Sequence, residues 1–430
     1  MSQSYEDEIR AGLRHNFAIV IGVHAMWSLG AAFYNWGTMM PVFLKELGAN
    51  NFHIGLMQGL TSLAMFSPQM IAAQKTSHLA VKKTLFPFVH YPGLIAVGVM
   101  GASALAWGKS EALIPVTICC MTVMGLSLSF AIPMWSNLVA KLVPSETRGF
   151  SFGLIFFVGG VTGLAGATAA KYIIRHFGFA GFGWGFVVAS ALLVGAVSFF
   201  FFLKEPPHPE PPIKKGIGEF FRDMKRDLLC HRDYRHYLLS KSLSSLGTMA
   251  FPFYAAAAVG KFDLGPEAGA EFTLLLILGR MVGAPLFGWI GDRTGFRAIA
   301  FFPPGINVMC TSLAILAEEV PTFYLIFFLG GLSTSADTVS SLNLPIEYCP
   351  EADKTTFIAV KGTVTGPLMF AAPLLGGFLA DHLAWKFKVT FSAALLFELA
   401  AFLILLFLVN EPRRNPASSL TSDNKEEPNE

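Results

Sequence analysis

Long apolar runs recur along the chain, separated by short polar stretches, and this pattern limits the possible folds most strongly. A membrane-spanning helix needs about 20 consecutive, mainly apolar residues. The runs are long enough for this, and none alternates between apolar and polar residues as the strands of a membrane barrel do. We therefore predict an all-α polytopic membrane protein. Its twelve predicted spans cover residues 16–43, 54–73, 84–106, 112–139, 150–173, 183–203, 237–259, 268–290, 298–317, 322–347, 357–380 and 389–409.

The composition supports a membrane protein and argues against several other classes. Charged residues make up 14% of the chain, whereas a soluble domain carries about 25%. The formal net charge of +2 gives no indication of a nucleic-acid partner. The five cysteines show neither paired nor zinc-like spacing, and the sequence shows no ATP-binding or enzyme motif. We therefore expect no catalytic residue, no cofactor and no bound metal, and a protein that is not an enzyme.

The distribution of basic residues predicts the orientation of the spans. Cytoplasmic loops of membrane proteins carry an excess of Lys and Arg. If the N-terminus is cytoplasmic, 21 of the 31 Lys and Arg residues fall in cytoplasmic segments and only 7 fall outside, with the rest inside spans. An even number of spans places both termini on one side. We therefore predict a multi-pass protein of the cell inner membrane with both termini in the cytoplasm.

One long polar segment divides the chain into two parts. Residues 204–236 begin with a Pro-rich stretch and continue as a basic stretch with apolar residues at helical spacing. We predict a six-helix bundle over residues 1–203, a cytoplasmic linker with an amphipathic surface helix over 204–236, and a second six-helix bundle over 237–410. A solvated linker without that helix is the alternative. The polar tail, residues 411–430, is predicted to be disordered.

The two halves also resemble each other in sequence. Shifting the chain on itself by 206 residues sets Gly125 on Gly331 and Asn137 on Asn343, with further identities around them. This shift equates span four with span ten. The halves are therefore predicted to be related copies.

A loop in the second half carries a resemblance to a known family. The stretch Gly288-Trp-Ile-Gly-Asp-Arg-Thr-Gly-Phe-Arg297 resembles the signature loop of the major facilitator superfamily of secondary transporters. The chain length, the twelve spans, the long linker and the repeat are similar to that family too. The first-half counterpart, residues 74–83, departs from the pattern because it has neither Asp nor Gly.

The resemblance implies a fold and a set of moving parts. It implies two pseudo-symmetric six-helix bundles around a midplane cavity that is lined by spans one, four, seven and ten. It also implies that the signature loop gates transport through the interface of spans eight and eleven. The residues assigned to this gate are Gly288, Gly291, Asp292, Arg293, Gly295 and Arg297.

Ionisable side chains inside spans are the candidate binding or coupling residues, because a charge in the bilayer interior is costly. Arg280 lies near the middle of span eight, Asp337 lies in a polar run of span ten, and Lys361 lies near the start of span eleven. His24 of span one is a further candidate. The predicted supporting polar residues are Asn35, Asn137 and Asn343.

Two interpretations of the interior charges stay open at the level of sequence. Arg280 and Asp337 could form a purely structural ion pair. Alternatively, Arg280 binds the carboxylate or phosphate of a substrate, and Asp337 binds a proton or serves as a counter-charge. We expect Lys241, at the start of span seven, to extend its ammonium group towards the membrane surface. Glu398, in span twelve, has no assigned role because the resemblance places that span at the periphery.

The sequence therefore predicts a secondary active transporter that moves a small solute across the membrane by alternating access. A small organic anion is the leading substrate class, with coupling to protons or exchange. The expected partners are a small molecule, the lipid bilayer and protons. The alternatives are an exporter of amphipathic compounds and a sensor or assembly factor that does not transport, because fold does not determine function.

Overall fold

Helices make up every regular element of the described chain. The computed structural model describes residues 3–77, 79–142, 148–207, 218, 222, 232–348, 354–383 and 387–410. The predicted surface helix and the predicted disordered tail therefore lie almost entirely outside the described residues. Ten of the described helical segments are long and apolar enough to cross a membrane. The second predicted span coincides with two shorter helices, Asn51–Phe66 and Gln69–Ser77. The tenth coincides with the long helix Val320–Glu347, which contains the polar run 333–341.

The first half of the chain supplies six spans. Span one is broken at Asn35, where a short 3-10 turn, η1 (Ala32–Tyr34), precedes a second helix. The helices are α1 (Gln3–Ala31), α2 (Met39–Glu46), α3 (Asn51–Phe66), α4 (Gln69–Ser77), α5 (Leu85–Trp107), α6 (Leu113–Leu142), α7 (Arg148–Phe177) and α8 (Phe179–Ser198), and the 3-10 turn η3 (Phe199–Phe202) follows.

The second half repeats this layout. Span seven is also broken, by the 3-10 turn η4 (Thr248–Ala250). The helices are α10 (Arg232–Gly247), α11 (Phe251–Phe262), α12 (Ala268–Thr294), α13 (Phe296–Ala300), α14 (Phe302–Leu316), α15 (Val320–Glu347), α16 (Lys354–His382) and α17 (Phe387–Leu408).

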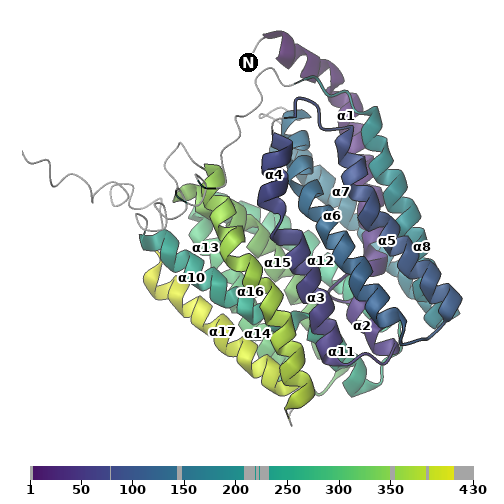
Figure 1. Cartoon of the computed structure of the whole chain (residues 1–430). Coiled ribbons are helices and arrows are strands. Elements are labelled where there is room, and N and C mark those ends of the chain that lie inside the picture. The colour runs from purple at the N-terminus through teal and green to yellow at the C-terminus, as the bar shows by residue number, and fades with distance from the viewer. Residues whose placement is uncertain are drawn as a thin grey trace, which may run out of the picture.

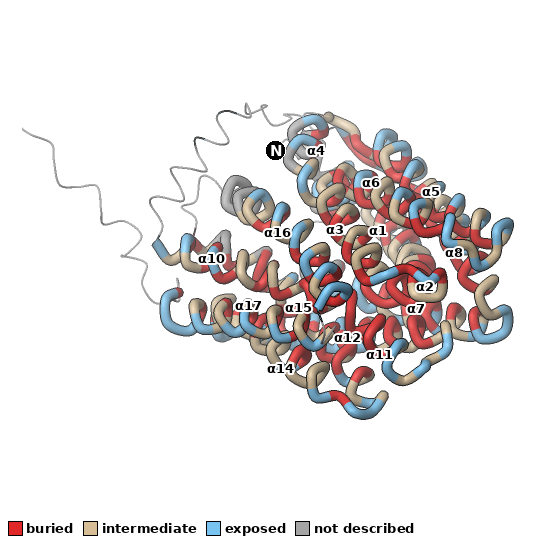
Figure 2. The backbone as a smooth tube through the Cα atoms, turned by 60° about the horizontal axis from the view of Figure 1, so that its bottom comes forward, coloured by how far each residue is buried: buried red, intermediate tan, exposed pale blue. Residues whose placement is uncertain are grey.

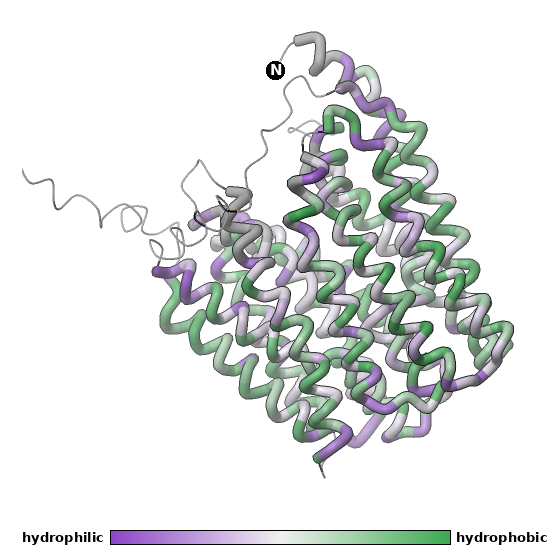
Figure 3. Tube along the Cα trace, viewed as in Figure 1, coloured by the Kyte–Doolittle hydropathy of each residue, from purple (hydrophilic) through white to green (hydrophobic). Residues whose placement is uncertain are grey.

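The packing of the helices confirms the predicted fold of two six-helix bundles. In the first half, α5 packs on α6 and α8, and α1 packs on α7 and α8; in the second half, α14 packs on α15 and α17, and α10 packs on α16 and α17. Each contact therefore recurs six spans later. Figure 1 shows the first bundle, coloured purple to teal, beside the second, coloured teal to yellow. Hydrophilic residues gather towards the ends of the helices, and apolar residues fill the length between them (Figure 3).

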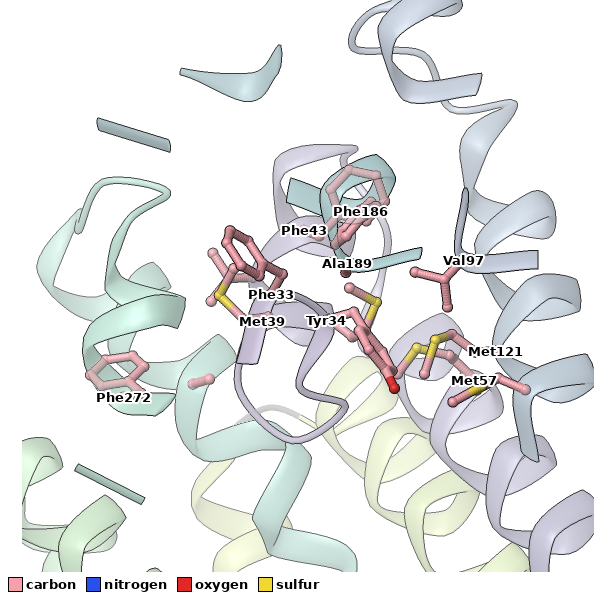
Figure 4. Close-up of a cluster of buried hydrophobic side chains, with 14 of the residues drawn as sticks. Phe33, Tyr34, Met39, Phe43, Met57, Val97, Met121, Phe186, Ala189 and Phe272 are labelled. Atoms are coloured by element: carbon pink, nitrogen blue, oxygen red, sulfur yellow. The ribbon is translucent and has the colours of Figure 1, made fainter. Parts of the chain in front are cut away.

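The core of the first bundle is aromatic and lies near the connection between α7 and α8. The ring of Phe43, in α2, packs against Phe179, Phe182 and Phe186 with centroid distances of 5.6, 5.2 and 5.1 Å. Figure 4 shows Phe43 and Phe186 of this cluster together with Tyr34, whose hydroxyl points towards Met57 and Met121. Figure 2 shows the burial of each residue along the chain. Buried residues lie mainly on the helix faces that point into the bundles, and exposed residues lie mainly on the outer faces.

The most extensive contacts between the bundles are those of α3 with α16 and of α7 with α12, and α2 also packs on α11 and α12. Glycines make the close approach possible, as expected for helix packing in a membrane. A Cβ atom on Gly55 of α3 would overlap the Pro373 carbonyl group of α16, and a Cβ atom on Gly160 of α7 would overlap Met281 of α12. Span five, which is α7, therefore contributes a small residue to the interface between the bundles.

The bundles are held together at one end, which we call the hairpin end because α2 connects to α3 and α16 connects to α17 there. Asp381, at the end of α16, accepts hydrogen bonds from the backbone N–H groups of Asn51 (3.1 Å) and Phe52 (2.7 Å) at the start of α3. Negative charge is favourable at a helix N-terminus. Lys171 of α7 also forms an ion pair with Glu271 of α12 at 2.9 Å.

The bundles are separated at the opposite end, which we call the linker end because Lys204 and Arg232 lie there. Gly153 lies two turns before Gly160 on the same face of α7, yet no atom lies within 4 Å of a Cβ placed there. The same is true of Gly288, two turns beyond Met281 on α12. The structure therefore has an open linker end and a closed hairpin end.

The contacts of Asp381 should hold the hairpin end closed. Replacing it with Ala removes a charged acceptor from the first turn of α3, which should weaken this contact by about 1–2 kcal/mol. The equilibrium between the two ends should then shift by roughly 5- to 30-fold. The measurement is the distance between spin labels on Gly153→Cys and Gly288→Cys, in a chain whose five native cysteines have been replaced.

The control for this experiment is Glu46→Ala, which breaks an ion pair with Lys109 inside the first bundle. Short distances at the linker end should become more frequent in Asp381→Ala and stay as in the parent protein in the control. If both variants keep the parent distribution, Asp381 does not hold the hairpin end.

Candidate functional site

A cavity of about 450 Å³ lies inside the first bundle and reaches α12 of the second. This volume is within the range of small-molecule sites. Its walls come from α1, α3, α5, α6, α7 and α8 and from the turns η1 and η3, and large aromatic and methionine side chains form much of the lining. The aromatic and methionine residues of the lining are Trp27, Tyr34, Trp36, Phe86, Trp135, Phe156, Phe200, Met65, Met121 and Met124.

Arg280 brings a full positive charge to this cavity, from the middle of α12. Its backbone is fixed on the α15 side, because Ser335 Oγ donates to the Arg280 carbonyl at 3.0 Å and Gly279 allows α15 to approach closely. The guanidinium group is left to face the cavity. No ion pair or hydrogen bond of this group is found among the described residues.

His24 and Asn35 line the same cavity. The His24 ring stacks with Trp135 at a centroid distance of 6.3 Å and meets Phe156 edge-on at 5.4 Å. The His24 imidazole also lies within electrostatic range of the Arg280 guanidinium group. Asn35 accepts a hydrogen bond from the Gly37 N–H group at 3.0 Å and so shapes the break in span one. The structure thus brings three of the predicted polar residues, His24, Asn35 and Arg280, to one site.

Asn137 and Asn343 are not among the residues that line this cavity. Each side-chain amide donates to a carbonyl group four residues earlier on its own helix, that of Pro133 or that of Val339, at 2.8 Å in both cases. Asn137 and Asn343, which the 206-residue shift aligns, therefore also form the same hydrogen bond within their helices.

Asp337 does not pair with Arg280, the partner that one interpretation of the sequence proposed. Its carboxylate pairs with the Lys241 ammonium group of α10 and accepts a hydrogen bond from Ser341 Oγ at 3.3 Å. The structure thus shows a Lys241–Asp337 ion pair in place of the Arg280–Asp337 pair, and the expectation that Lys241 extends to the membrane surface is wrong. Lys361 donates to the Ser341 carbonyl at 3.3 Å and lies close to the same carboxylate. These charges form a second polar region, inside the second bundle.

Glu398 of α17 points into that bundle, although its span was expected at the periphery without a role. Its side chain is 1% exposed, accepts from Ser244 Oγ at 2.8 Å and from Asn307 Nδ2 at 2.9 Å, and fills the space left by the missing side chain of Gly247. The sequence did show an acid inside a span, which is the signal for such a site. What it did not show was the direction in which α17 faces.

The signature loop forms a tight turn in which Gly295 has a φ of +91°, a value that favours glycine. The Arg293 guanidinium lies over the Trp289 ring, 4.1 Å from its centroid. Arg297 donates to the carbonyl groups of Leu405 and Leu406 at 3.3 and 3.4 Å, where a positive charge is favourable at the end of α17. The contacts of Arg297 thus run to span twelve, and gating at spans eight and eleven stays a prediction.

The loop between α4 and α5 lacks the acid of the signature pattern, and Glu205, from the segment after η3, brings a carboxylate to this loop. Glu205 accepts from the backbone N–H groups of Lys82 and Lys83 at 2.9 and 2.8 Å and pairs with Lys141 at 2.9 Å. Burial lowers the pKa of the Lys82 ammonium group, and the Glu205 carboxylate opposes this shift. The 206-residue shift sets Glu205-Pro206 on Glu411-Pro412, a signal that could have drawn attention to this acid.

Comparisons with known proteins point to one family. Residues 25–302 and 237–428 match the family model of the Major Facilitator Superfamily. The tetracycline resistance protein, class E, of Escherichia coli is 28% identical over 153 residues, which are 36% of this chain and 36% of that protein. The gentisate transporter of Corynebacterium glutamicum is 25% identical over 295 residues, 66% of this chain and 64% of that protein. These alignments therefore span less than two thirds of either relative.

The fold of the chain is also that of solved transporters. A transporter of the POT family, solved in complex with a thioalcohol-conjugated peptide, superposes with a TM-score of 0.69 at 11% sequence identity. The superposition covers 94% of this chain and 97% of that one. At this level of identity, the likeness establishes the fold.

Glu205 should be a main stabilising residue at the linker end of the first bundle. Glu205→Ala leaves two backbone donors and the Lys141 charge without their acceptor, so the free energy of unfolding should fall by about 3 kcal/mol. Glu205→Gln keeps an oxygen acceptor and should lose less. Thermal unfolding of the purified protein in detergent measures both, with Glu46→Ala as an exposed control. A midpoint for Glu205→Ala equal to that of the control would contradict this role.

Proposed function

Because the chain belongs to the Major Facilitator Superfamily, we propose that it moves a small organic anion across the membrane by alternating access, with Arg280 as the ligand of the anionic group. The observation that carries this proposal is the position of Arg280. It presents an accessible guanidinium group, without an ion-pair partner among the described residues, to a cavity whose other lining residues carry no full charge and are mostly apolar.

The chemistry of the cavity fits an anion that also has an apolar part. A guanidinium group binds a carboxylate or phosphate through two parallel hydrogen bonds. Low-dielectric walls strengthen this attraction, because little water screens it. The aromatic and methionine side chains can pack against the apolar part of the solute, and His24 and Asn35 provide further polar contacts. The gentisate transporter, whose named cargo is an organic anion, supports this substrate class.

The arrangement of the bundles supports access from the linker end. The helices that join the bundles are in close contact at the hairpin end and diverge at the linker end. The positive-inside rule places the linker end in the cytoplasm, so the proposed orientation is inward-facing with both termini inside. The breaks at Asn35 in span one and at η4 in span seven are places where these two helices can bend as the cavity changes sides.

Export of amphipathic compounds is the second candidate function. The aromatic and methionine lining and the similarity to a tetracycline resistance protein favour it. A sensor that does not transport would fit a cavity sealed by aromatic side chains. The cavity is open enough to expose Arg280, so we favour transport.

Substituting Arg280 tests the proposal directly. In proteoliposomes, the parent protein should transport one or more labelled aromatic or aliphatic carboxylates. Arg280→Ala should weaken their binding by about 10- to 100-fold, because a hydrogen bond to a charged group contributes about 1.5–3 kcal/mol. Arg280→Lys should recover only part of the loss, since an ammonium group lacks the planar fork.

The matched control is Lys388→Ala, which removes an exposed positive charge at the hairpin end. It should transport the same carboxylates as the parent protein. Sugars and cationic dyes belong in the same panel. If a neutral or cationic solute is transported and its transport survives Arg280→Ala, the anion proposal is wrong and export of amphipathic compounds takes its place.

A further inference from the structure

A buried carboxyl group lies at the break in span seven, away from the residues that line the cavity. Glu398 extends from α17 towards Gly247, the last residue of α10, directly before η4. A Cβ atom on Gly247 would overlap the Glu398 carboxyl group. Glycine at this position therefore admits the acid to the interior of the second bundle, where its side chain is 1% exposed.

The direct hydrogen-bond partners of Glu398 are neutral. Ser244 Oγ lies 2.8 Å from Oε2, and Asn307 Nδ2 lies 2.9 Å from Oε1. No ion pair of Glu398 occurs within the described part of the chain. An ionised carboxylate without a paired cation is costly in such a place, so binding a proton relieves that cost.

These two partners can satisfy the carboxyl group in both protonation states. Ser333 Oγ donates to Asn307 Oδ1 at 2.8 Å, which fixes the amide so that its Nδ2 faces Glu398 in either state. The Ser244 hydroxyl can donate to the carboxylate, or turn and accept from the carboxylic acid, because a hydroxyl is both donor and acceptor. A purely structural acid would need only one of these arrangements.

The charged and titratable groups around Glu398 and its neighbouring ion pair come from five helices. Lys241 of α10 lies within electrostatic range of Glu398 and is paired with Asp337 of α15. Cys310 of α14 and Tyr254 of α11 lie close by as neutral groups. Lys361 of α16 lies close to Asp337. Lys241 is thus attracted by two carboxylates when Glu398 is ionised, and mainly by Asp337 when Glu398 is protonated.

We propose that Glu398 is a proton-binding site of the transport cycle, whose protonation state acts on the Lys241–Asp337 pair and on the break in span seven. The step is the addition of one proton from bulk water to the carboxylate, to give the carboxylic acid, and no other bond changes. The Asp337 side chain is 45% exposed, so the ion pair next to the buried acid reaches the accessible surface of the second bundle. Only the coupling of this proton to a solute rests on the function proposed above.

Infrared difference spectroscopy on the purified full-length protein tests the site without any substrate. As the pH is lowered, the carbonyl band of a protonated, buried carboxyl group should appear. Glu398→Gln should remove this band, because a glutamine amide can keep both hydrogen bonds while it cannot take up a proton. Glu319→Gln, at an exposed glutamate, is the control and should keep the band.

Ser244→Ala keeps Glu398 and should move the band, because the acid loses its hydroxyl partner. This variant tests the site even if Glu398→Gln does not fold. A band that persists in folded Glu398→Gln, or that stays unmoved in Ser244→Ala, would overturn the proposal, and so would the absence of any such band in the parent protein.

Transport supplies a separate test of the coupling. The ratio of solute uptake with an imposed proton gradient to uptake without one should fall towards one in Glu398→Gln and stay at the parent value in Glu319→Gln. An unchanged ratio in Glu398→Gln would contradict the coupling. If the parent protein moves no anion but the infrared band behaves as expected, the substrate proposal fails while the proton site stands.

Discussion

A charge inside a bilayer must have a partner, and the interior of this protein is organised by that constraint. In the second bundle, Asp337 is paired with Lys241, and Glu398 accepts hydrogen bonds from neutral donors. Arg280 differs, because its guanidinium group faces a cavity and has no ion pair among the described residues. A ligand anion would complete this pairing, so the proposed solute site follows from the same constraint that applies in the second bundle.

The interiors of the two bundles differ in chemical character. The interior of the first is a cavity lined by large apolar side chains, and the interior of the second holds the polar network. Among the described residues, glycine contacts join the bundles along α3 with α16 and along α7 with α12, and the ion pair and the Asp381 hydrogen bonds between the bundles lie at the hairpin end. Since glycine interfaces carry no charge that fixes a single position, the bundles can rock about them, and the polar contacts determine which end is closed.

The sequence predicted most of the fold, because the length of apolar runs and the spacing of the repeat are properties of the chain alone. Of the seven residues that the sequence predicted to bind the solute or to couple, the structure brings His24, Asn35 and Arg280 to one cavity, whereas Asp337, Lys361, Asn137 and Asn343 do not line it. The partner of Asp337 could not be predicted in this way, because periodicity does not say which of several basic residues a carboxylate meets across a bundle. The inward direction of Glu398 and the role of Glu205 were missed for the same reason, since both depend on contacts between segments more than a hundred residues apart.

The central claim is that Arg280 recognises the charge of the solute. Its most direct test is the binding of an aromatic carboxylate and of its neutral amide to the purified protein, with Arg280 and with Arg280→Ala, as a cycle of two ligands and two proteins. We predict that the parent protein prefers the carboxylate by about 10- to 100-fold and that Arg280→Ala binds both ligands with similar affinity. A preference of the same size in Arg280→Ala would contradict the claim, because another group would then hold the anion.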